Sequence, residues 1–241
     1  MSINPWMTWR LWLALSPMNC LRVSVRDIDV PTTILHECYQ SIMSSLPFSI
    51  LALLADGEYH SGSDIGAAVG VSRTAVWKHL QKLLDVGLPV KSVKGRGYRL
   101  EDGIELLASA AITPLLTPIV REQVALDIAM EVDSTNNVAM THIRNGGRRG
   151  YISLAEYQSV GRGRRGRHWV SPFGYNVYLS LVWEFEGGVS ALEGLSLAVG
   201  VAISRALLEL GLSDVALKWP NDILLSGRKL GGVLLEMSGD P

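Results

Sequence analysis

One stretch of the chain combines arginine and glycine at a density that indicates contact with an anion. Residues 161–169 read Gly-Arg-Gly-Arg-Arg-Gly-Arg-His-Trp. Arginine donates paired hydrogen bonds to phosphate groups, and glycine lets the backbone come close to them. The glycine spacing also matches a dinucleotide-binding pattern, but the proline and glycine that follow Trp169 argue against the helix which that pattern requires. The stretch is therefore interpreted as a basic loop, which either has no special role or orders over an anionic ligand.

Three further polar stretches lie at the ends of apolar runs. They are Asp133–Asn136 at a predicted strand-to-helix junction, Glu156–Gln158 directly before the basic loop, and Lys218–Asp222. Strand ends and helix starts are where α/β domains assemble ligand sites. Taken singly, Ser134 is interpreted only as a helix cap. The asparagine and aspartate at 221–222 are likewise interpreted only as a turn. Together with the loop, these stretches favour a ligand site.

A different pattern occupies residues 46–100. It predicts helices over 46–55 and 64–69, a tight glycine turn, and a third helix that Ser72 can cap and that ends at Gly87. The apolar positions of the third helix form one stripe, namely Val76, Leu80, Leu83 and Leu84. A β-hairpin with a basic turn follows at 90–100. This order predicts a winged helix-turn-helix.

The charge of this segment supports contact with DNA. Residues 46–100 carry seven basic and four acidic side chains, a net charge of +3, whereas the whole chain has a formal net charge of -1. Contact with nucleic acid must therefore come from a local patch. The N-terminal part of a recognition helix normally meets bases and phosphates. The candidates for DNA binding are Ser72, Arg73, Thr74 and Lys78.

Composition limits the classes of protein to which the chain can belong. With 241 residues, 48% hydrophobic and 19% charged, the chain has the profile of a folded protein of two domains. Cys20 and Cys38 cannot build a disulfide framework or a zinc site. The apolar stretch 6–15 is too short to span a membrane and lacks the cleavage pattern of a secretory signal. A soluble, cytoplasmic protein without a resident metal is expected.

Helices and strands are predicted to alternate after a connecting helix and a proline-bearing linker at 101–122. The predicted strands cover 125–132, 151–157 and 176–185, the helices cover 134–145 and 190–210, and residues 215–237 are rich in β-like sequence. This pattern predicts an α/β domain whose sheet is covered by helices. Periodicity leaves open whether the sheet is parallel or mixed.

The combination of these motifs resembles the biotin protein ligases. The resemblance is carried by the basic loop, the strand 176–183, Lys218–Asp222, and the run Arg228–Gly232 with Glu236 downstream. The winged helix-turn-helix makes the chain similar to those members that also repress the biotin operon. The resemblance covers residues 46–238. It implies an α/β (α+β) chain with a mixed sheet in a biotin/lipoate-ligase-like catalytic domain.

The domain boundaries expected from this resemblance are a leader of unknown role at 1–45, the winged helix-turn-helix at 46–103, a linker at 104–122, and an incomplete catalytic domain at 123–241. Members of the family continue with another strand, further helices and a small β-barrel domain. We therefore expect that the catalytic domain extends beyond residue 241.

The activity implied by the resemblance has two half-reactions. Biotin and MgATP give biotinyl-5′-adenylate and pyrophosphate, and a lysine of the biotin carboxyl carrier protein of acetyl-CoA carboxylase then takes the biotin. The adenylate also promotes a homodimer that binds operator DNA. The implied catalytic residues are Lys218 and Arg164. The implied biotin and adenylate contacts are Ser134, Thr135, Asn136, Gln158, Gly161, Arg162, Gly163, Arg164, Trp169 and Lys218. Two alternatives stay open, a winged-helix regulator without catalysis and a ligase of the lipoate type.

Overall fold

The computed structural model describes residues 6–13, 45–85, 88–101, 103–185 and 193–238. The chain divides into two compact units. One unit, here the helix-turn-helix unit, spans residues 16–106. The other, the sheet unit, comprises residues 1–15 and 107–241. The cysteines and residues 14–44 of the predicted leader lie outside the described residues.

The helix-turn-helix unit has the predicted order of elements. They are α2 (Ser45–Leu54), α3 (Gly62–Val69), α4 (Arg73–Asp85), β2 (Val90–Val93) and β3 (Gly97–Leu100). The Ser61 hydroxyl accepts a hydrogen bond from the Asp64 N–H at the start of α3, and the Ser72 hydroxyl accepts one from the Ala75 N–H at the start of α4. Because each hydroxyl satisfies a first-turn N–H, these serines fix where the helices begin.

A small apolar core holds these helices and the hairpin together. It comprises Ile50, Leu51, Leu54, Ile65, Val76, Leu80, Leu83 and Leu100, all at most 1% exposed. The hairpin also bonds to the chain before α3, since the Tyr98 N–H donates to the His60 carbonyl and the His60 N–H donates to the Tyr98 carbonyl, both at 2.9 Å. Gly97 allows this approach, because a Cβ there would lie 2.0 Å from the His60 oxygen.

The sheet unit is built on seven strands in the order β4-β5-β6-β1-β9-β8-β7. Their bounds are β1 (Trp6–Leu13), β4 (Ala125–Ala129), β5 (Tyr151–Ala155), β6 (Val177–Glu184), β7 (Val215–Lys218), β8 (Asp222–Leu225) and β9 (Arg228–Ser238). Strands β4 and β5 are parallel, and the other described pairs are antiparallel. The sheet is therefore mixed, as the resemblance implied and periodicity left open.

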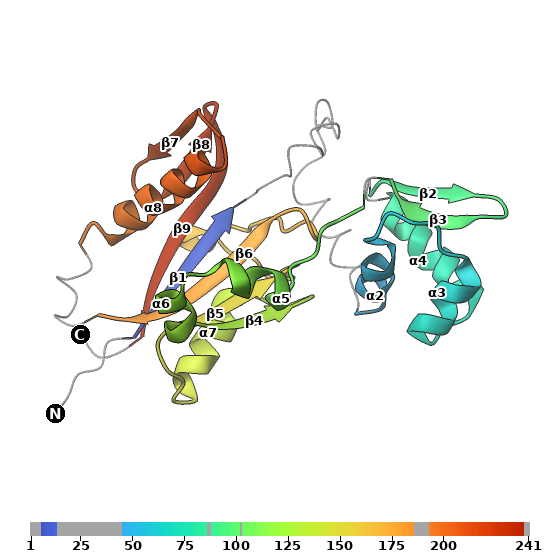
Figure 1. Ribbon diagram of the computed structural model, residues 1–241, viewed down its shortest axis with the longest axis horizontal. Coiled ribbons are helices and arrows are strands. Elements are labelled where there is room, and N and C mark those ends of the chain that lie inside the picture. The colour runs from blue at the N-terminus through green and yellow to red at the C-terminus, as the bar shows by residue number, and fades with distance from the viewer. Residues whose placement is uncertain (1–5, 14–44, 86–87, 102, 186–192, 239–241) are drawn as a thin grey trace. The chain divides into compact units, whose positions relative to one another are not determined.

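Strand β1 differs from the expectation for the N-terminal segment. Residues 6–13 are part of the segment interpreted as a leader, yet they pair antiparallel with both β6 and β9 (Figure 1). The sequence Trp-Met-Thr-Trp-Arg-Leu-Trp-Leu is rich in residues that favour strands. Residues 7–11 alternate between apolar and polar, which is a strand signal, but the apolar residues on both sides interrupt the period, and the segment was interpreted as a leader.

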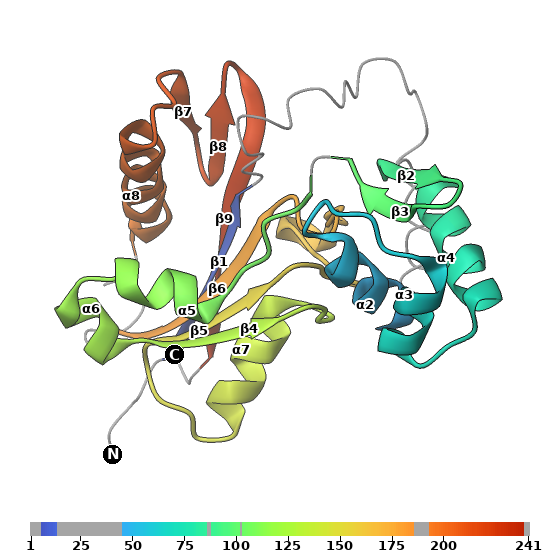
Figure 2. The same ribbon diagram turned by 45° about the vertical axis from the view of Figure 1, so that its right-hand side comes forward.

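Two helices cover opposite faces of this sheet (Figure 2). Helix α7 (Thr135–Arg144) packs Ala139 and Ile143 against Val182 of β6. Helix α8 (Leu195–Glu209) packs against the cluster that includes Leu181 of the same strand. Because successive side chains of a strand point to opposite faces, the neighbours at 181 and 182 place α7 and α8 on different sides.

The predicted linker forms short helices. They are α5 (Ser109–Ile112), the 3₁₀ helix η1 (Thr113–Leu115) and α6 (Pro118–Gln123). Proline stands in the first turn of both η1 and α6, where a missing N–H is tolerated. None of the helices that the model describes is both long and apolar enough to cross a membrane.

Candidate functional site

A cluster of buried polar side chains, here the buried polar cluster, lies where α7 begins. Its members are Ser134, Thr135, Asn136, Gln158 and Ser180, each at most 2% exposed. The Gln158 Oε1 accepts from the Thr135 N–H at 2.9 Å and from the Thr135 hydroxyl at 3.2 Å, and that hydroxyl lies 2.8 Å from the Ser180 hydroxyl. The strand end after β5 is thereby fixed to the first turn of α7.

Three polar atoms of this cluster have no partner among the described residues. They are the Ser134 Oγ, the Asn136 Oδ1 and the Gln158 Nε2. Ser134 stands at the N-cap position of α7, but its hydroxyl caps nothing, so the interpretation of Ser134 as a helix cap is incomplete. A buried polar atom without a partner costs about 1–3 kcal/mol. The cluster can recover this cost by binding a small ligand that both donates and accepts hydrogen bonds.

The basic loop forms a short hairpin beside this cluster. The Gly163 N–H donates to the Arg167 carbonyl at 2.6 Å and the Trp169 N–H donates to the Gly161 carbonyl at 2.9 Å. At the tip of the hairpin, Arg165 has a φ of 57°, in the left-handed region that favours glycine. No helix suited to a dinucleotide follows, since the described structure after the loop is irregular up to β6. The sequence argument against the dinucleotide pattern is thereby confirmed.

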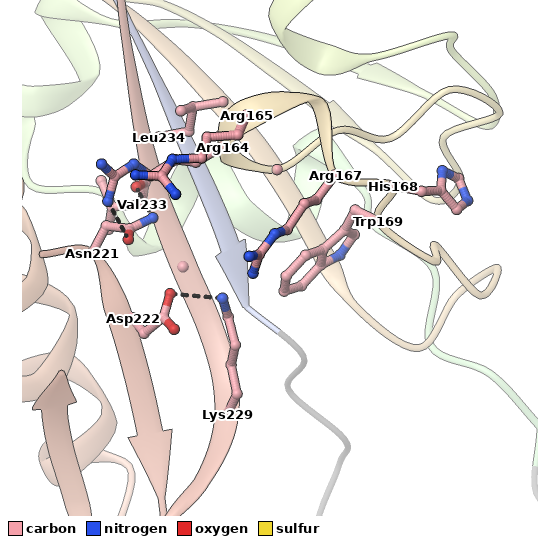
Figure 3. A pocket seen from close by; sticks show the side chains of 12 residues that line it. Arg164, Arg165, Arg167, His168, Trp169, Asn221, Asp222, Lys229, Val233 and Leu234 are labelled. Carbon is pink, nitrogen blue, oxygen red and sulfur yellow. Dashed lines mark hydrogen bonds and ion pairs between the residues drawn. The ribbon is translucent and has the colours of Figure 1, made fainter. Parts of the chain in front are cut away.

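The loop forms one wall of a cavity of about 400 Å³, here the cationic cavity. The opposite wall comes from the turn before β8 and from β9. The lining residues are Gly163, Arg164, Arg165, Arg167, His168, Trp169, Asn221, Asp222, Lys229, Gly232, Val233 and Leu234. Figure 3 shows Arg164 directed to Asn221 and Lys229 directed to Asp222. The cavity therefore presents several cations to whatever enters it.

Lys229 is the lysine that the β8–β9 hairpin brings to this cavity. Its Nζ lies 2.6 Å from the Asp222 Oδ1 and 5.5 Å from the centroid of the Trp169 ring. The turn residues Ser226 and Gly227 both have positive φ, as a two-residue type I′ turn requires. This turn pairs Lys229 with Leu224, which shares a face with Asp222 because they are two residues apart.

Lys218, the lysine that the resemblance implied in catalysis, lies beside the cationic cavity and not among the described residues that line it. It ends β7, pairs with Asp222 in the strand register, and is exposed. It lines a hollow of about 10 Å³ beside α8. Lys229 lies within the run Arg228–Gly232 that carries the resemblance, but the resemblance implied no role for it. The signal that could have found it is the Ser-Gly turn, which predicts the hairpin.

Most of the other predicted contacts lie near one another. Arg162 donates to the Asn137 Oδ1 in the first turn of α7, which links the loop to the helix that carries the buried polar cluster. The Asn136 Nδ2 donates to the Glu236 Oε2, which links that helix to β9. Trp169 offers a flat ring at the cavity wall, with Lys229 over it. The described residues thus bring together all predicted site residues of this unit except Lys218.

A buried carboxyl supports the strand end that carries Gln158. Glu156 is 2% exposed, and its Oε1 accepts a hydrogen bond from the Leu107 N–H where the sheet unit resumes after residue 106. Its own N–H donates to the Ala129 carbonyl and its carbonyl accepts from the Gly174 N–H. Burial raises the pKa of the Glu156 carboxyl above its ordinary value, and the Leu107 N–H offsets part of this effect.

The helix-turn-helix unit presents its predicted DNA contacts to solvent. Ser72, Arg73, Thr74 and Lys78 are exposed. Ser72 and Arg73 lie at the start of α4, and Thr74 and Lys78 lie on the side of the helix away from the buried Val76 and Leu80. Trp77 on the same surface is half exposed. A helix with its apolar stripe in the core and a basic surface outside suits insertion into the major groove.

The wing adds a group that the sequence analysis missed. The Tyr59 ring lies between two arginines of the hairpin, with the Arg96 guanidinium 4.1 Å and the Arg99 guanidinium 4.9 Å from its centroid. Such cation–π contacts hold guanidinium groups in place. The tyrosine precedes α3 by three positions, and only the pairing of His60 with Tyr98 brings it to the hairpin.

Comparison with known proteins supports both units. Residues 129–239 match the model of the biotin/lipoate A/B protein ligase family, and residues 48–99 match a helix-turn-helix domain model. The chain is similar to the bifunctional ligase/repressor BirA of Salmonella typhimurium, at 43% identity over 81% of this chain and 59% of that protein. It is also similar to the bifunctional ligase/repressor BirA of Bacillus subtilis, at 34% identity over 77% of this chain and 57% of that protein.

The chain thus spans less than three fifths of the length of each of these curated relatives. Among solved structures, the biotin acetyl coenzyme A carboxylase synthetase of Helicobacter pylori with bound biotinylated ATP is similar at 26% identity over 48% of this chain and 59% of that chain, with a TM-score of 0.42. Two parts of the chain thus match known domains, residues 129–239 the biotin/lipoate A/B protein ligase family and residues 48–99 a helix-turn-helix domain, and the chain is similar to bifunctional ligase/repressors.

Proposed function

We propose that the sheet unit binds biotin and ATP, forms biotinyl-5′-adenylate, and transfers the biotin to a lysine of a carrier protein. The observation that carries this proposal is that the buried polar cluster and the cationic cavity lie next to each other in the sheet unit. The buried polar cluster has unpartnered atoms for a small polar ring, and the cationic cavity suits phosphate. The loop and the first turn of α7 join them through the Arg162–Asn137 hydrogen bond.

The chemistry of the buried polar cluster favours biotin over lipoate. The ureido ring of biotin carries two N–H donors and one carbonyl acceptor, whereas the dithiolane ring of lipoate has neither. The Asn136 Oδ1 can accept from a ureido N–H, and the Gln158 Nε2 can donate to the ureido carbonyl. The Ser134 hydroxyl can do either. A ligand without these groups would leave the three atoms buried and unsatisfied.

The cationic cavity suits the first half-reaction. An oxygen of the biotin carboxylate attacks the α-phosphorus of ATP, the new oxygen–phosphorus bond forms, and pyrophosphate leaves. Two anions must approach each other, so positioned cations contribute more than a covalent nucleophile. Arg164 and Lys229 line the cavity in which this charge would develop. We therefore assign to Lys229 the role that the sequence analysis gave to Lys218.

The second half-reaction needs the cavity to keep water out. The Nζ of an acceptor lysine attacks the acyl carbon, the proton of the amine is lost, and AMP leaves. Until the acceptor arrives, the mixed anhydride must be shielded from hydrolysis, a task for the loop. The Trp169 ring at the cavity wall can stack on adenine. Carboxyl carrier protein of acetyl-CoA carboxylase is the acceptor that we propose.

Magnesium fits this account as a partner of ATP and not as a resident metal. Mg²⁺ is commonly bound by one or two carboxylates together with substrate phosphates. Asp222 is the carboxylate that lines the cavity, 2.6 Å from the Lys229 Nζ. We infer that Mg²⁺ enters with the triphosphate.

Adenylate formation tests the proposal directly. The chain is incubated with radiolabelled ATP, Mg²⁺ and either biotin or lipoate, and the acyl adenylate and pyrophosphate are quantified. We expect adenylate with biotin and at most a trace with lipoate. Adenylate with lipoate alone would replace the biotin proposal by the lipoate alternative, and no adenylate with either acid would overturn both.

We also propose that the helix-turn-helix unit represses biotin synthesis genes by binding their operator. The exposed basic residues of α4 and the basic wing support this second function. The sequence implied that the adenylate promotes a homodimer, and a dimer would suit a two-fold operator. Biotinyl-adenylate would then serve as reaction intermediate and as corepressor. Operator binding would take place in the cytoplasm.

DNA binding is tested with Arg73→Ala combined with Lys78→Ala, measured against DNA from upstream of biotin synthesis genes. We expect specific binding to be lost and adenylate formation to be unchanged. The salt dependence of residual binding should also flatten, by about one unit of slope for each lost phosphate contact. Arg205→Ala, which removes an exposed arginine of α8, is the matched control. Parental DNA affinity of the double variant would rule out α4 as the recognition helix.

A further inference from the structure

Two arginines of the basic loop are held by asparagine side chains. Arg162 donates to the Asn137 Oδ1 of α7, and Arg164 donates to the Asn221 Oδ1 before β8 at 3.1 Å. The two arginines flank Gly163, and the two asparagines belong to segments 84 residues apart. The loop is therefore anchored on both sides.

Each asparagine is itself fixed by its amide nitrogen. The Asn137 Nδ2 donates to the Asp133 Oδ2 at 2.5 Å, and the Asn221 Nδ2 donates to the Val233 carbonyl at 3.0 Å. The Asn221 carbonyl also accepts from the Val233 N–H at 2.8 Å. The hydrogen bond of each amide nitrogen fixes the orientation of the carboxamide group. In that orientation the carboxamide oxygen points toward the arginine.

A carboxamide is a neutral acceptor, and this decides how firmly it holds a guanidinium group. A hydrogen bond with one ionised partner is about twice as strong as a neutral one, and a guanidinium that meets a phosphate or carboxylate can form two parallel hydrogen bonds in place of one. An anionic oxygen of a phosphate or carboxylate can therefore displace the asparagine oxygen. An aspartate in the same place would form an ion pair and compete with the ligand.

We propose that Asn137 and Asn221 are positioning residues that hold Arg162 and Arg164 at the cavity before substrate binds and release them to anionic oxygens of the ligand. The proposal rests on the proposed function, because the ligand is the acyl adenylate or its precursors. It refines the alternative in which the loop orders over an anionic ligand. Much of the ordering takes place beforehand, which lowers the conformational entropy lost on binding.

The test uses the double variant Asn137→Ala with Asn221→Ala and hydrogen exchange of residues 159–173, read by mass spectrometry. In the ligand-free protein, we expect the Gly163 and Trp169 amides to exchange about tenfold faster than in the parent chain. With biotin and MgATP bound, exchange should equal that of the parent, because the asparagine bonds are no longer made. Asn145→Ala, at the exposed end of α7, is the control and should change neither state.

The rate of biotinyl-adenylate dissociation is a second measurement. It would change if the two asparagines stabilised the ligand-bound loop as well as the ligand-free loop. The double variant should release biotinyl-adenylate at the parental rate within about twofold, since its asparagines do not hold the bound state. Unchanged exchange in the ligand-free variant, or faster exchange and faster release in the bound variant, would overturn the proposal. If the parent chain forms no adenylate, the proposed function fails, and ligand-free exchange still decides whether the asparagines hold the loop.

Discussion

The two ligand-facing regions of the sheet unit differ in burial and in charge. The buried polar cluster is almost inaccessible to solvent, and its side chains are neutral. The cationic cavity is lined by exposed arginines and by Lys229, whose side chain is 44% exposed. A buried neutral group can recognise a ring by hydrogen bonds that are costly to leave unmade. Exposed cations can stabilise the negative charge that develops during a reaction, and placing them at the site costs less desolvation than burying a charged side chain.

This difference leads to a division of labour. The buried polar cluster should determine which acid binds and how tightly. The cationic cavity should determine the rate at which the carboxylate displaces pyrophosphate from the α-phosphorus of ATP. Interactions that are stronger in the transition state than in the ground state raise the rate, and uniform interactions raise only the affinity. Substitutions in the two regions should therefore alter different kinetic parameters.

The largest expected effect is that of Lys229→Ala. Loss of one positioned donor to a developing charge typically lowers the rate by about 10²–10³-fold. We expect a loss of this size in adenylate formation at saturating biotin and ATP, with the fold intact by circular dichroism. Lys218→Ala is the matched control, since it removes an exposed lysine that does not line the cavity, and it should retain activity within about threefold. The reverse pattern would restore Lys218 to the catalytic role.

Arg164→Gly should have the next largest effect. A charge-assisted bond to phosphate is lost and the loop gains backbone freedom, so biotinyl-adenylate should dissociate about tenfold faster. Arg164→Ala separates the two causes, because it removes the charge with a smaller gain in freedom. Release at the parental rate in both variants would show that Arg164 does not hold the phosphate.

Ser134→Ala should affect binding and stability in opposite directions. The Ser134 hydroxyl has no partner among the described residues, so its removal leaves the fold unchanged or slightly more stable. Biotin should bind about tenfold more weakly, since one ligand hydrogen bond is lost. Thermal unfolding and calorimetric titration with biotin are the measurements. A lowered Tm with parental affinity would mean that the hydroxyl supports the fold and not the ligand.

The smallest expected effect is that of Glu156→Gln, and it depends on pH. Burial raises the pKa of this carboxyl from 4.5, so the folded state binds the proton more tightly than the unfolded chain. The resulting stability is present below the unfolded pKa and is lost as the pH rises through the folded pKa. Glutamine keeps an acceptor for the Leu107 N–H and cannot ionise.

We therefore expect Glu156→Gln to raise the Tm of the sheet unit at pH 7.5, because glutamine is not ionised there and the buried carboxylate no longer has to be desolvated. The gain should shrink as the pH falls toward the ordinary glutamate value. Differential scanning calorimetry at several pH values measures it. A Tm difference that is constant with pH would show that ionisation of Glu156 does not limit stability.

Much of the fold was predictable from local pattern. Serine caps, the apolar stripe of α4 and the alternation of helices and strands predicted elements that the structure confirms within a few residues at each end. Strand order and the mixed character of the sheet were not predictable from periodicity, because they depend on contacts far apart in sequence. Strand β1 was missed because the alternation in residues 7–11 is short and is flanked by apolar residues that interrupt the period.

The site residues that a motif specifies were predictable from the sequence. The choice between two candidate residues of neighbouring motifs was not, because it depends on how the strands pair. Ser134, Gln158 and the loop arginines follow from resemblance and lie where the two regions are. The choice between Lys218 and Lys229 depends on the β8–β9 turn and on a register shift after Ile223, which a motif does not encode. Asn137 gave no signal, and Asn221 taken singly predicted only a turn, because a carboxamide near a turn has an ordinary local explanation.

The division of labour is tested most directly by single-turnover adenylate formation, measured as a function of biotin concentration at saturating MgATP, for the parent, Ser134→Ala and Lys229→Ala. We predict that Ser134→Ala raises the half-saturating biotin concentration about tenfold and leaves the maximal rate within about twofold. Lys229→Ala should lower the maximal rate about 100-fold or more and leave half-saturation nearly unchanged. If both variants altered the same parameter to a similar extent, the two regions would act as one site and the account would be contradicted.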